Sequence, residues 1–360
     1  MKILHIAESI KGGVATYINE IGPYQTEKYG DGNVYFLIPE SDAGYLTSAQ
    51  AKQLITFKGK RRSPITMLRF MFFALRNIYR VKPDIIHLHS TFAGALVRLP
   101  FLCWLKPCKI IYCAHGYAFL MDVSEWRKKV FALIEKILAW RTDVIINISH
   151  HEGLEAIKVG LPKGTLVTIT NGLSPLLSTV HTASLGRGGI KLLFVGRFDR
   201  QKGFDILLEH FRKLEDSSSL HLYVAGGAVL DGQNLPDIPE NVTLLGWLPN
   251  DQLQSYYKSV DALIVPSRWE GFGFVAVEAM RAETAVIASN RGSLAEIVSH
   301  RKTGLLFNLD TPFELRKILI SLRKEDLAVY GEAGKKRFLE FYTADRLNKE
   351  IADLYDKLML

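Results

Sequence analysis

The sequence has no apolar run long enough to cross a membrane, and it has very few cysteines. A transmembrane helix needs about 20 consecutive apolar residues, and no stretch of this chain of 360 residues supplies them. Its three cysteines, Cys103, Cys108 and Cys113, follow one another at intervals of five residues, which fits neither a CxxC metal pair nor an even set of disulfides. Residues 1–8 reach a charge too early for a signal peptide. We therefore expect reduced, mostly buried thiols and a cytoplasmic protein.

The sequence also lacks the glycine fingerprint of a dinucleotide-binding oxidoreductase. In such enzymes G-x-G-x-x-G follows the first strand directly. The corresponding stretch here, residues 11–16, reads KGGVAT, in which the two glycines are adjacent. This spacing argues against an NAD-dependent oxidoreductase.

The net charge of +8 belongs to the first half of the chain. Residues 1–180 contain 22 Lys and Arg against 13 Asp and Glu, whereas residues 181–360 contain 23 against 24. Such an excess predicts an anionic partner, either nucleic acid or an anionic membrane surface. Two stretches in which cations alternate with apolar and aromatic residues, 57–82 and 126–131, favour the membrane over nucleic acid. The sequence leaves open whether the aromatic side chains of 57–82 face the membrane or pack in a core helix.

Strand and helix patterns alternate along almost the whole chain. The strands predicted in the first half are residues 2–7, 34–38, 85–88, 109–113, 144–148 and 167–170. Those predicted in the second half are residues 191–195, 220–225, 242–244, 262–265, 285–288 and 304–307. The alternation predicts an α/β protein in which each half forms a doubly wound parallel sheet.

The expected domain boundary is a polar stretch rich in Ser, Thr and Gly, residues 173–189. This linker would join a first Rossmann-like domain, residues 1–172, to a second, residues 190–342. Residues 343–360 are expected to form a helix that packs back on the first domain.

Two glutamates frame a glycine turn in the stretch WEGFGFVAVEAM, residues 269–280. Glu270 is expected in the loop that follows a buried strand, and Glu278 about one turn inside the next helix. The glycines allow the backbone to approach a ligand closely, and the helix N-terminus favours phosphate. Because a carboxylate repels phosphate, each glutamate is better suited to sugar hydroxyls. The pattern predicts a nucleotide-sugar site, with one glutamate on the sugar and the other on the ribose.

Two cations lie at the end of the strand predicted at residues 191–195. Arg197 can bind two oxygens of a diphosphate at once, and Lys202 can add a point charge. The alternative for this loop, taken by itself, is an ordinary solvated basic turn.

In their order and spacing, these features resemble the retaining GT-B glycosyltransferases of family 4, and the resemblance covers almost the whole chain. Glu270 and Glu278 match the E-x7-E motif of that family. Each further match is weak by itself: Gly12-Gly13 after the first strand, His115-Gly116, Asn171-Gly172, Arg197 with Lys202-Gly203, Pro266-Ser267 and Glu296. The resemblance implies the GT-B fold, in which two Rossmann-like domains face each other across a cleft.

The resemblance implies a role for each matched residue on the donor side. Glu270 would contact hydroxyls of the donor sugar, and Glu278 would bind the ribose. Arg197 and Lys202 would neutralise the diphosphate as it departs. Backbone groups would hold the sugar and phosphate at Phe272, Gly273, Phe274 and Val275.

The first domain would contribute three further residues. Gly13 would offer its N–H to the phosphate, and His115 would lie beside the donor sugar near its anomeric centre. His89, which ends a neighbouring predicted strand, is expected to line the acceptor side.

Retention of configuration follows from the resemblance alone. No carboxylate of the first half is an evident nucleophile, which fits a front-face displacement in which the leaving phosphate takes the acceptor proton. The chain also contains no D-x-D triplet, the motif with which transferases of the other major fold bind a divalent metal and diphosphate. We therefore expect neither a metal nor another cofactor.

Bacterial relatives in this family commonly extend lipid-linked sugars. We accordingly expect a hexosyl- or N-acetylhexosaminyl-transferase, with a UDP-sugar favoured over a GDP-sugar, acting in O-antigen, capsule or exopolysaccharide assembly. The protein would lie on the inner face of the cell membrane and bind no nucleic acid. Two alternatives stay open: a UDP-sugar epimerase of the same fold, and a non-enzymatic binder of anionic membranes or nucleic acid, which the basic half alone supports.

Overall fold

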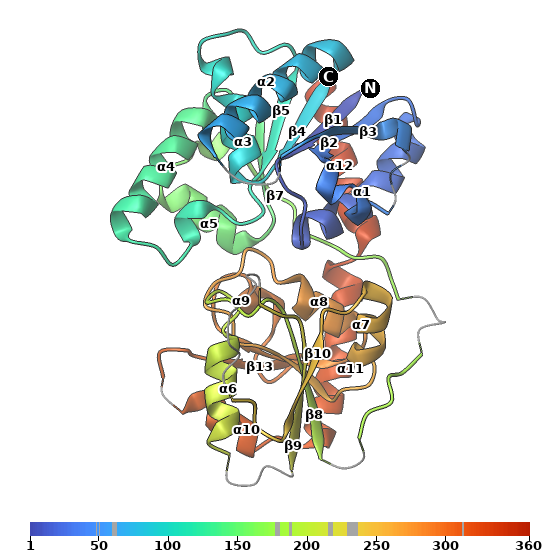
Figure 1. The fold of residues 1–360 in the computed structure, drawn as a ribbon, viewed down its shortest axis with the longest axis vertical. Helices are drawn as coiled ribbons and strands as arrows, with labels where there is room; N and C mark the ends of the chain where they lie inside the picture. Colours follow the sequence, from blue (N-terminus) through green and yellow to red (C-terminus); the bar gives the residue numbers. More distant parts are fainter. Residues whose placement is uncertain are drawn as a thin grey trace. The chain divides into compact units, whose positions relative to one another are not determined.

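The computed structural model describes residues 1–47, 49, 51–59, 63–176, 181–186, 189–214, 219–228, 237–311 and 313–360. The chain divides into two compact units (Figure 1). Unit 1 consists of Met1–Ser174 together with Ala344–Leu360, and unit 2 consists of Pro175–Thr343. Within the described residues, no helix is both long and apolar enough to span a bilayer.

Unit 1 is built on a parallel sheet of seven strands in the order β3-β2-β1-β4-β5-β6-β7. The strands are β1 (Ile3–Ala7), β2 (Val34–Pro39), β3 (Leu54–Phe57), β4 (Ile85–His89), β5 (Lys109–Cys113), β6 (Val144–Asn147) and β7 (Leu166–Thr168). The α-helices are α1 (Gly13–Tyr29), α2 (Pro64–Val81), α3 (Thr91–Arg98), α4 (Glu125–Ala139), α5 (His150–Lys158) and α12 (Ala344–Met359). Short 3-10 helices are η1 (Glu40–Tyr45), η2 (Ala51–Gln53), η3 (Pro100–Leu102), η4 (Ala118–Leu120) and η5 (Lys163–Thr165).

Unit 2 repeats the same architecture with six parallel strands in the order β10-β9-β8-β11-β12-β13. The strands are β8 (Ile190–Val195), β9 (Leu220–Ala225), β10 (Val242–Gly246), β11 (Ala262–Val265), β12 (Ala285–Ser289) and β13 (Gly304–Phe307). The helices are α6 (Phe204–Arg212), α7 (Asn250–Tyr257), α8 (Phe274–Arg281), α9 (Leu294–Ile297), α10 (Glu314–Ile320) and α11 (Lys324–Phe341). Both sheets confirm the predicted α/β class with doubly wound parallel sheets.

The helices of unit 1 cover both faces of its sheet. In Figure 1, α2, α3 and α4 lie together on one side, and α1 and α12 lie on the other. β1 and β4 are buried along their whole length, as expected for parallel strands covered on both faces. The sequence prediction missed β3, a partly buried edge strand of four residues.

The aromatic residues of the basic stretch 57–82 divide between the two roles that the sequence left open. In α2, Phe70, Ala74 and Ile78 pack into the core. Leu68 and Phe72 are exposed, with 51% and 61% of their surface accessible. Lys60, Arg61 and Arg62 lie outside the described residues. The helix therefore supplies a core face and also keeps an apolar surface next to its cations.

The C-terminal helix α12 is part of unit 1, where it packs beside α1. The backbone N–H of Ala344 donates to the carbonyl of Leu173 at 2.9 Å, and Lys28 forms an ion pair with Asp356 at 2.8 Å.

The expected linker 173–189 differs from the observed boundary. The units divide after Ser174, and the N–H of Ala183 donates to the hydroxyl of Ser259 at 2.7 Å. Part of this polar stretch therefore packs on unit 2, because its backbone finds hydrogen-bond partners there.

Candidate functional site

Each sheet has one point where the chain reverses the direction in which strands are added. In unit 1 this point lies between β1 and β4, and in unit 2 it lies between β8 and β11. The loops that leave the carboxyl ends of the two strands diverge there, so open α/β sheets bind ligands at this point. Residues singled out from the sequence follow all four strands: Gly13 after β1, His89 at the end of β4, Arg197 after β8 and Glu270 after β11.

In unit 2, Lys202 and Glu270 form an ion pair at this point. The Lys202 ammonium contacts Oε1 of Glu270, with 18% and 7% of the two side chains exposed. The hydroxyl of Ser267 donates to the same carboxylate oxygen at 2.9 Å. The sequence predicted separate partners for the two charges, the diphosphate and the sugar. The structure adds that the two charges are also direct neighbours of each other.

Glycines allow these loops to approach one another. Gly203 has a φ of +70°, and a Cβ at this position would lie 2.1 Å from the carbonyl oxygen of Pro266. Gly292 has a φ of +57°, and its Cβ would lie 2.4 Å from the carbonyl oxygen of Glu270. A side chain at either glycine would separate the loops that hold Lys202 and Glu270.

Arg197 lies at the exposed side of the same region. Its guanidinium pairs with Asp199 at 2.9 Å, and 48% of the side chain is accessible. It also donates to the side-chain oxygen of Gln201 at 3.0 Å. Asp199 and Gln201 thus keep the guanidinium in the loop that follows β8.

Glu278 is the fifth residue of α8, as predicted. The hydroxyl of Tyr257, at the end of α7, donates to its carboxylate at 2.8 Å. Burial and the neighbouring Glu278 charge raise the pKa of Tyr257 well above its usual range. Tyr257 therefore remains a hydrogen-bond donor that orients Glu278. Sequence reasoning missed it, because a tyrosine at a helix end carries no distinct motif.

The remaining predicted donor residues form the start of α8. Gly273 has a φ of +88° and precedes the first helical residue, Phe274, which Val275 follows. Phe272 is buried, and its carbonyl accepts a hydrogen bond from the hydroxyl of Ser293 at 2.6 Å. Ser293, the residue before α9 (Leu294–Ile297), thus fixes the turn through this hydrogen bond.

In unit 1, Gly13 and His115 lie at the carboxyl ends of β1 and β5. Gly12 adopts a φ of +73°, and Gly13 begins α1 with its backbone exposed. His115 adopts a φ of +54°, an uncommon conformation for a residue with a side chain, and is half-buried. Burial lowers the pKa of His115 from 6.5 to about 3, so the imidazole is neutral at physiological pH.

The structure corrects the expected position of His89. Its side chain is fully buried, and Nδ1 lies 2.9 Å from Nε2 of His115. Its Nε2 lies 3.0 Å from Nδ1 of His5 on β1. Because both ring nitrogens are in hydrogen bonds and no surface is accessible, His89 lies behind His115 and not on a surface that an acceptor could reach.

His5, His87 and His89 form a buried group that the sequence analysis did not identify. One ring nitrogen from each lies within 4.8 Å of the others, so this group could hold a metal ion. In the structure, however, both ring nitrogens of His5 and of His89 are in hydrogen bonds. The alternation of strand side chains was the available signal, because it places His87 and His89 on one face of β4.

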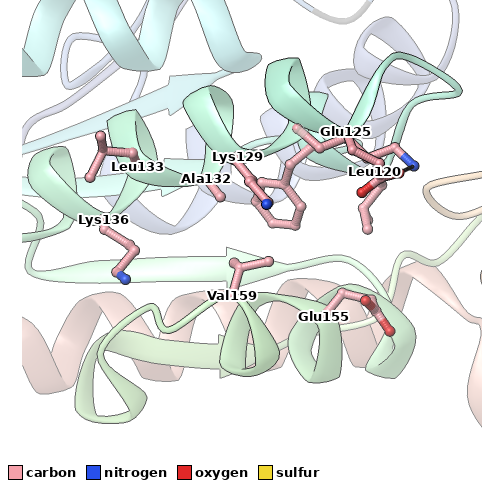
Figure 2. A pocket seen from close by; sticks show the side chains of 10 residues that line it. Leu120, Glu125, Lys129, Ala132, Leu133, Lys136, Glu155 and Val159 are labelled. Carbon is pink, nitrogen blue, oxygen red and sulfur yellow. Dashed lines mark hydrogen bonds and ion pairs between the residues drawn. The ribbon is translucent and has the colours of Figure 1, made fainter.

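A separate pocket of about 600 Å³ lies in unit 1 between α4, α5 and η4 (Figure 2). Its lining combines apolar side chains with three lysines and two glutamates: Phe119, Leu120, Glu125, Lys128, Lys129, Ala132, Leu133, Lys136, Glu155 and Val159. Both glutamates pair with lysines, Glu125 with Lys128 and Glu155 with Lys158, at 2.8 Å and 2.6 Å. Lys129, within the predicted basic stretch 126–131, and Lys136 form no ion pair with a described residue.

Comparison with known proteins identifies the family of this chain. The model of the family "Glycosyltransferase Family 4" matches residues 11–177, and that of "Glycosyl transferases group 1" matches residues 184–337. A protein of the cps region of Klebsiella pneumoniae, described as uncharacterized, is 37% identical over 89% of this chain and 90% of its own length. The O-antigen biosynthesis glycosyltransferase WbnH of Escherichia coli is 28% identical over 81% of this chain and 82% of its own length.

A solved structure extends the agreement to the fold. HepE of Anabaena, crystallised with UDP-glucose, superposes with a TM-score of 0.80 at 17% identity, covering 99% of this chain and 100% of its own. This likeness concerns the fold, and it agrees with the predicted GT-B architecture. From its two family matches and its relatives, the chain belongs to the family 4, group 1 glycosyltransferases and is a transferase enzyme.

Proposed function

We propose that this enzyme transfers a sugar from a nucleotide-sugar to a saccharide acceptor in the assembly of a surface polysaccharide, with retention of configuration and without a metal. The observation that carries the proposal is the cluster of Lys202, Glu270 and Ser267 beside the N-terminus of α8. One cation, one carboxylate and free helix amides occupy a single ligand-binding edge. These groups suit a phosphate next to a sugar.

In the proposed reaction, an acceptor hydroxyl attacks the anomeric carbon on the face from which the diphosphate leaves. The bond from the anomeric carbon to the phosphate oxygen breaks as the new glycosidic bond forms. The departing phosphate oxygen takes the acceptor proton. Lys202 and Arg197 stabilise the charge on the diphosphate, and Glu270 holds sugar hydroxyls. Catalysis then consists of charge stabilisation and positioning.

We favour UDP as the nucleotide and a lipid-linked saccharide as the acceptor. The binding of UDP-glucose by HepE and the O-antigen role of WbnH support these assignments by analogy. Glu278, oriented by Tyr257, would accept hydrogen bonds from the ribose hydroxyls. Gly13 would donate its N–H to the phosphate, and His115 would lie beside the sugar.

Unit 1 has the surface that a lipid-linked acceptor would need. Large apolar side chains are exposed on α4, among them Trp126 at 63% and Leu133 at 56%, and Trp140, which directly follows the helix, is 84% exposed. Leu68 and Phe72 add to them on α2, and α3 contacts both helices. Because Lys129 and other cations lie among these residues, the surface suits the interface of an anionic bilayer.

A panel of UDP-, GDP- and ADP-sugars, with lipid-linked saccharides as acceptors, tests the proposed reaction. We expect one donor to give a product larger than the acceptor by one sugar, with the anomeric configuration of the donor. Activity that persists in EDTA would support the absence of a metal. Conversion of a UDP-sugar without acceptor into its epimer would instead support the epimerase, and no binding of any nucleotide would support a non-enzymatic role.

Sedimentation with vesicles tests the membrane surface. We expect binding to anionic but not zwitterionic vesicles, and weaker binding after Trp126→Ala combined with Trp140→Ala. Trp247→Ala is the matched control, because Trp247 is 64% exposed in unit 2. Equal, negligible binding of the unmodified protein to both kinds of vesicle would exclude this part of the proposal.

A further inference from the structure

The buried polar groups behind His115 form one continuous chain of hydrogen bonds. Nε2 of His115 lies 2.9 Å from Nδ1 of His89. Nε2 of His89 lies 3.0 Å from Nδ1 of His5. Nε2 of His5 lies 2.7 Å from the side-chain oxygen of Gln25 on α1. This chain of hydrogen bonds thus runs from His115, at the carboxyl end of β5, through His89 and His5 to Gln25 on α1.

The far end of this chain determines the position of every proton in it. The side-chain oxygen of Gln25 can only accept, so Nε2 of His5 must donate to it. A neutral imidazole has one proton, which leaves Nδ1 of His5 as an acceptor. His89 must therefore donate from Nε2 and accept at Nδ1, and His115 must donate from Nε2.

The orientation of Gln25 is itself fixed by the C-terminal helix. The amide nitrogen of Gln25 donates to the hydroxyl of Tyr355 on α12 at 3.4 Å. That hydroxyl lies 2.6 Å from Nδ1 of His87, to which it can give its own proton. With the nitrogen of Gln25 engaged by Tyr355, its oxygen faces His5.

Burial keeps the rings of the chain neutral, as this pattern of single protons requires. It lowers the pKa of His5 to about 4 and that of His115 to about 3. Burial and the neighbouring histidines also lower the pKa of His89 well below its usual value. The left-handed backbone of His115 costs free energy, and such a conformation persists where its surroundings hold it. The bond to His89 and the ring of Tyr17, whose centroid lies 4.8 Å from that of His115, provide such surroundings.

We propose that Gln25 acts through two intervening histidines to hold the ring of His115 in one tautomer, with the proton on Nε2 and a lone pair on Nδ1. Nδ1 makes no hydrogen bond to a described residue, and the half-buried ring retains accessible surface at the end of β5. The ring then accepts a hydrogen bond from a donor-sugar hydroxyl and cannot donate one from that nitrogen. This inference rests on the proposed function, which places His115 beside the sugar. Gln25, His5 and His89 are positioning residues.

The test uses the full chain with isotope-labelled histidine and compares Gln25→Leu with Gln25→Glu. Long-range proton–nitrogen correlation spectra distinguish protonated from bare ring nitrogens and so report the tautomer directly. We expect one tautomer of His115 in the unmodified protein and a mixture in Gln25→Leu. The kcat of Gln25→Leu should fall in proportion to the fraction of His115 in the other tautomer, about twofold for an equal mixture, with little change in the KM for the donor. Gln25→Glu keeps an oxygen acceptor but adds a carboxylate beside His5, which favours a second proton on that ring. Nδ1 of His5 then donates to His89, the direction of each hydrogen bond reverses, and the proton of His115 moves to Nδ1.

Gln53→Leu is the matched control, because Gln53 is also a buried glutamine of unit 1 but donates to Thr26 at 3.0 Å. It should leave the tautomer of His115 unchanged. The inference is overturned if folded Gln25→Leu keeps a single tautomer of His115 and an unchanged kcat. It is equally overturned if the purified protein contains a metal ion on His5 and His89, since the ion would replace their hydrogen bond.

His115→Ala separates this inference from the proposed function. If His115→Ala slows transfer but Gln25→Leu changes neither the tautomer nor kcat, the positioning chain fails and the proposed function stands. If His115→Ala leaves transfer unchanged, the proposed role of His115 fails, whatever the spectra show.

Discussion

The two units place candidate functional side chains at the same point of similar sheets, but they hold them by different physical means. In unit 1 the groups behind His115 are neutral imidazoles, an amide and a phenol, joined by hydrogen bonds. In unit 2 the central contact is an ion pair between Lys202 and Glu270. A network of neutral groups determines the orientation of each ring and the position of each proton. An ion pair instead supplies two opposite charges, either of which can bind a ligand in place of its partner. Under the proposed function, the neutral network would orient the ring of His115, and the cations of unit 2 would neutralise the diphosphate.

The largest expected difference between the units is their response to acid. His5, His87, His89 and His115 are held neutral by burial, with pKa values lowered to about 4 and about 3 for His5 and His115. Below pH 6.5 the unfolded chain binds protons that the folded chain does not, so the free energy of unfolding falls as the pH falls toward these values. At pH 5.5, one unit below the ordinary pKa of histidine, each such group costs on the order of 1 kcal/mol, so the four together cost several kcal/mol.

Hydrogen exchange measured by mass spectrometry at pH 7.5 and 5.5, corrected for intrinsic rates, can test this expectation. Peptides of β1 and β4 should lose more protection than peptides of β8 and β11. His221→Gln, at a partly exposed histidine of unit 2, should leave the acid response of β1 and β4 unchanged. An equal loss of protection in the strands of both units would contradict the idea that the buried histidines make unit 1 the more sensitive to acid.

The next largest effect is expected for Lys202→Ala. The substitution removes a cation from the proposed diphosphate site and leaves Glu270 buried without its counter-charge. We expect kcat/KM to fall on the order of 100- to 1,000-fold, together with nucleotide affinity. Lys213→Ala, at a lysine paired with Glu209 on the surface of the same unit, should retain full activity. Transfer at the unmodified rate by a folded Lys202→Ala protein would show that the site is elsewhere.

Two glycine substitutions compare how tightly the loop after β8 in unit 2 and the loop after β1 in unit 1 are packed. Gly203→Ala places a Cβ 2.1 Å from a backbone oxygen at a φ of +70°, whereas Gly12→Ala, at a φ of +73°, meets nothing within 4 Å. We expect the first to lower the free energy of unfolding by about 3 kcal/mol and the second by about 1 kcal/mol. Thermal unfolding of the two variants tests the ranking, and similar losses would contradict the tight packing of the unit 2 loops.

The smallest effects should come from two tyrosine hydroxyls. Tyr257→Phe removes the hydrogen bond to Glu278 and should weaken nucleotide binding about fivefold, which corresponds to about 1 kcal/mol. The hydroxyl of Tyr17 is buried and has no hydrogen-bond partner among the described residues, so Tyr17→Phe should leave stability unchanged or raise it. Calorimetry of nucleotide binding and thermal unfolding measure the two effects. A clear loss of stability in Tyr17→Phe would show that this hydroxyl has an unrecognised partner.

The sequence predicted the fold well because buried parallel strands are short apolar runs. The strands at 109–113, 220–225 and 262–265 match β5, β9 and β11 to the residue. Glu270 and Glu278 were placed correctly before and within α8, because a glycine turn between an apolar run and a helical pattern is a local signal. β3 was missed because four partly buried residues at a sheet edge carry little pattern.

The contacts that organise the two edges could not be predicted from one sequence. Lys202 and Glu270 are 68 residues apart, and His87 and Tyr355 are 268 apart. Such pairs depend on which strands become neighbours and on where α12 packs. His89 was expected at a surface because it ends a strand. The register of β1 beside β4 instead places His5 opposite His87, and His89, two residues further along β4, is buried beside these rings.

The membership of α12 in unit 1 has a consequence for how the protein is made. On a ribosome the segment up to Ser174 emerges early, yet Tyr355 and its helix follow only after all of unit 2 has been translated. Until then α1 alone covers that side of the sheet of the nascent first unit, and Gln25 and His87 lack the phenol that they share in the finished molecule. A frameshift in the last codons would therefore damage the part of the protein that was synthesised first.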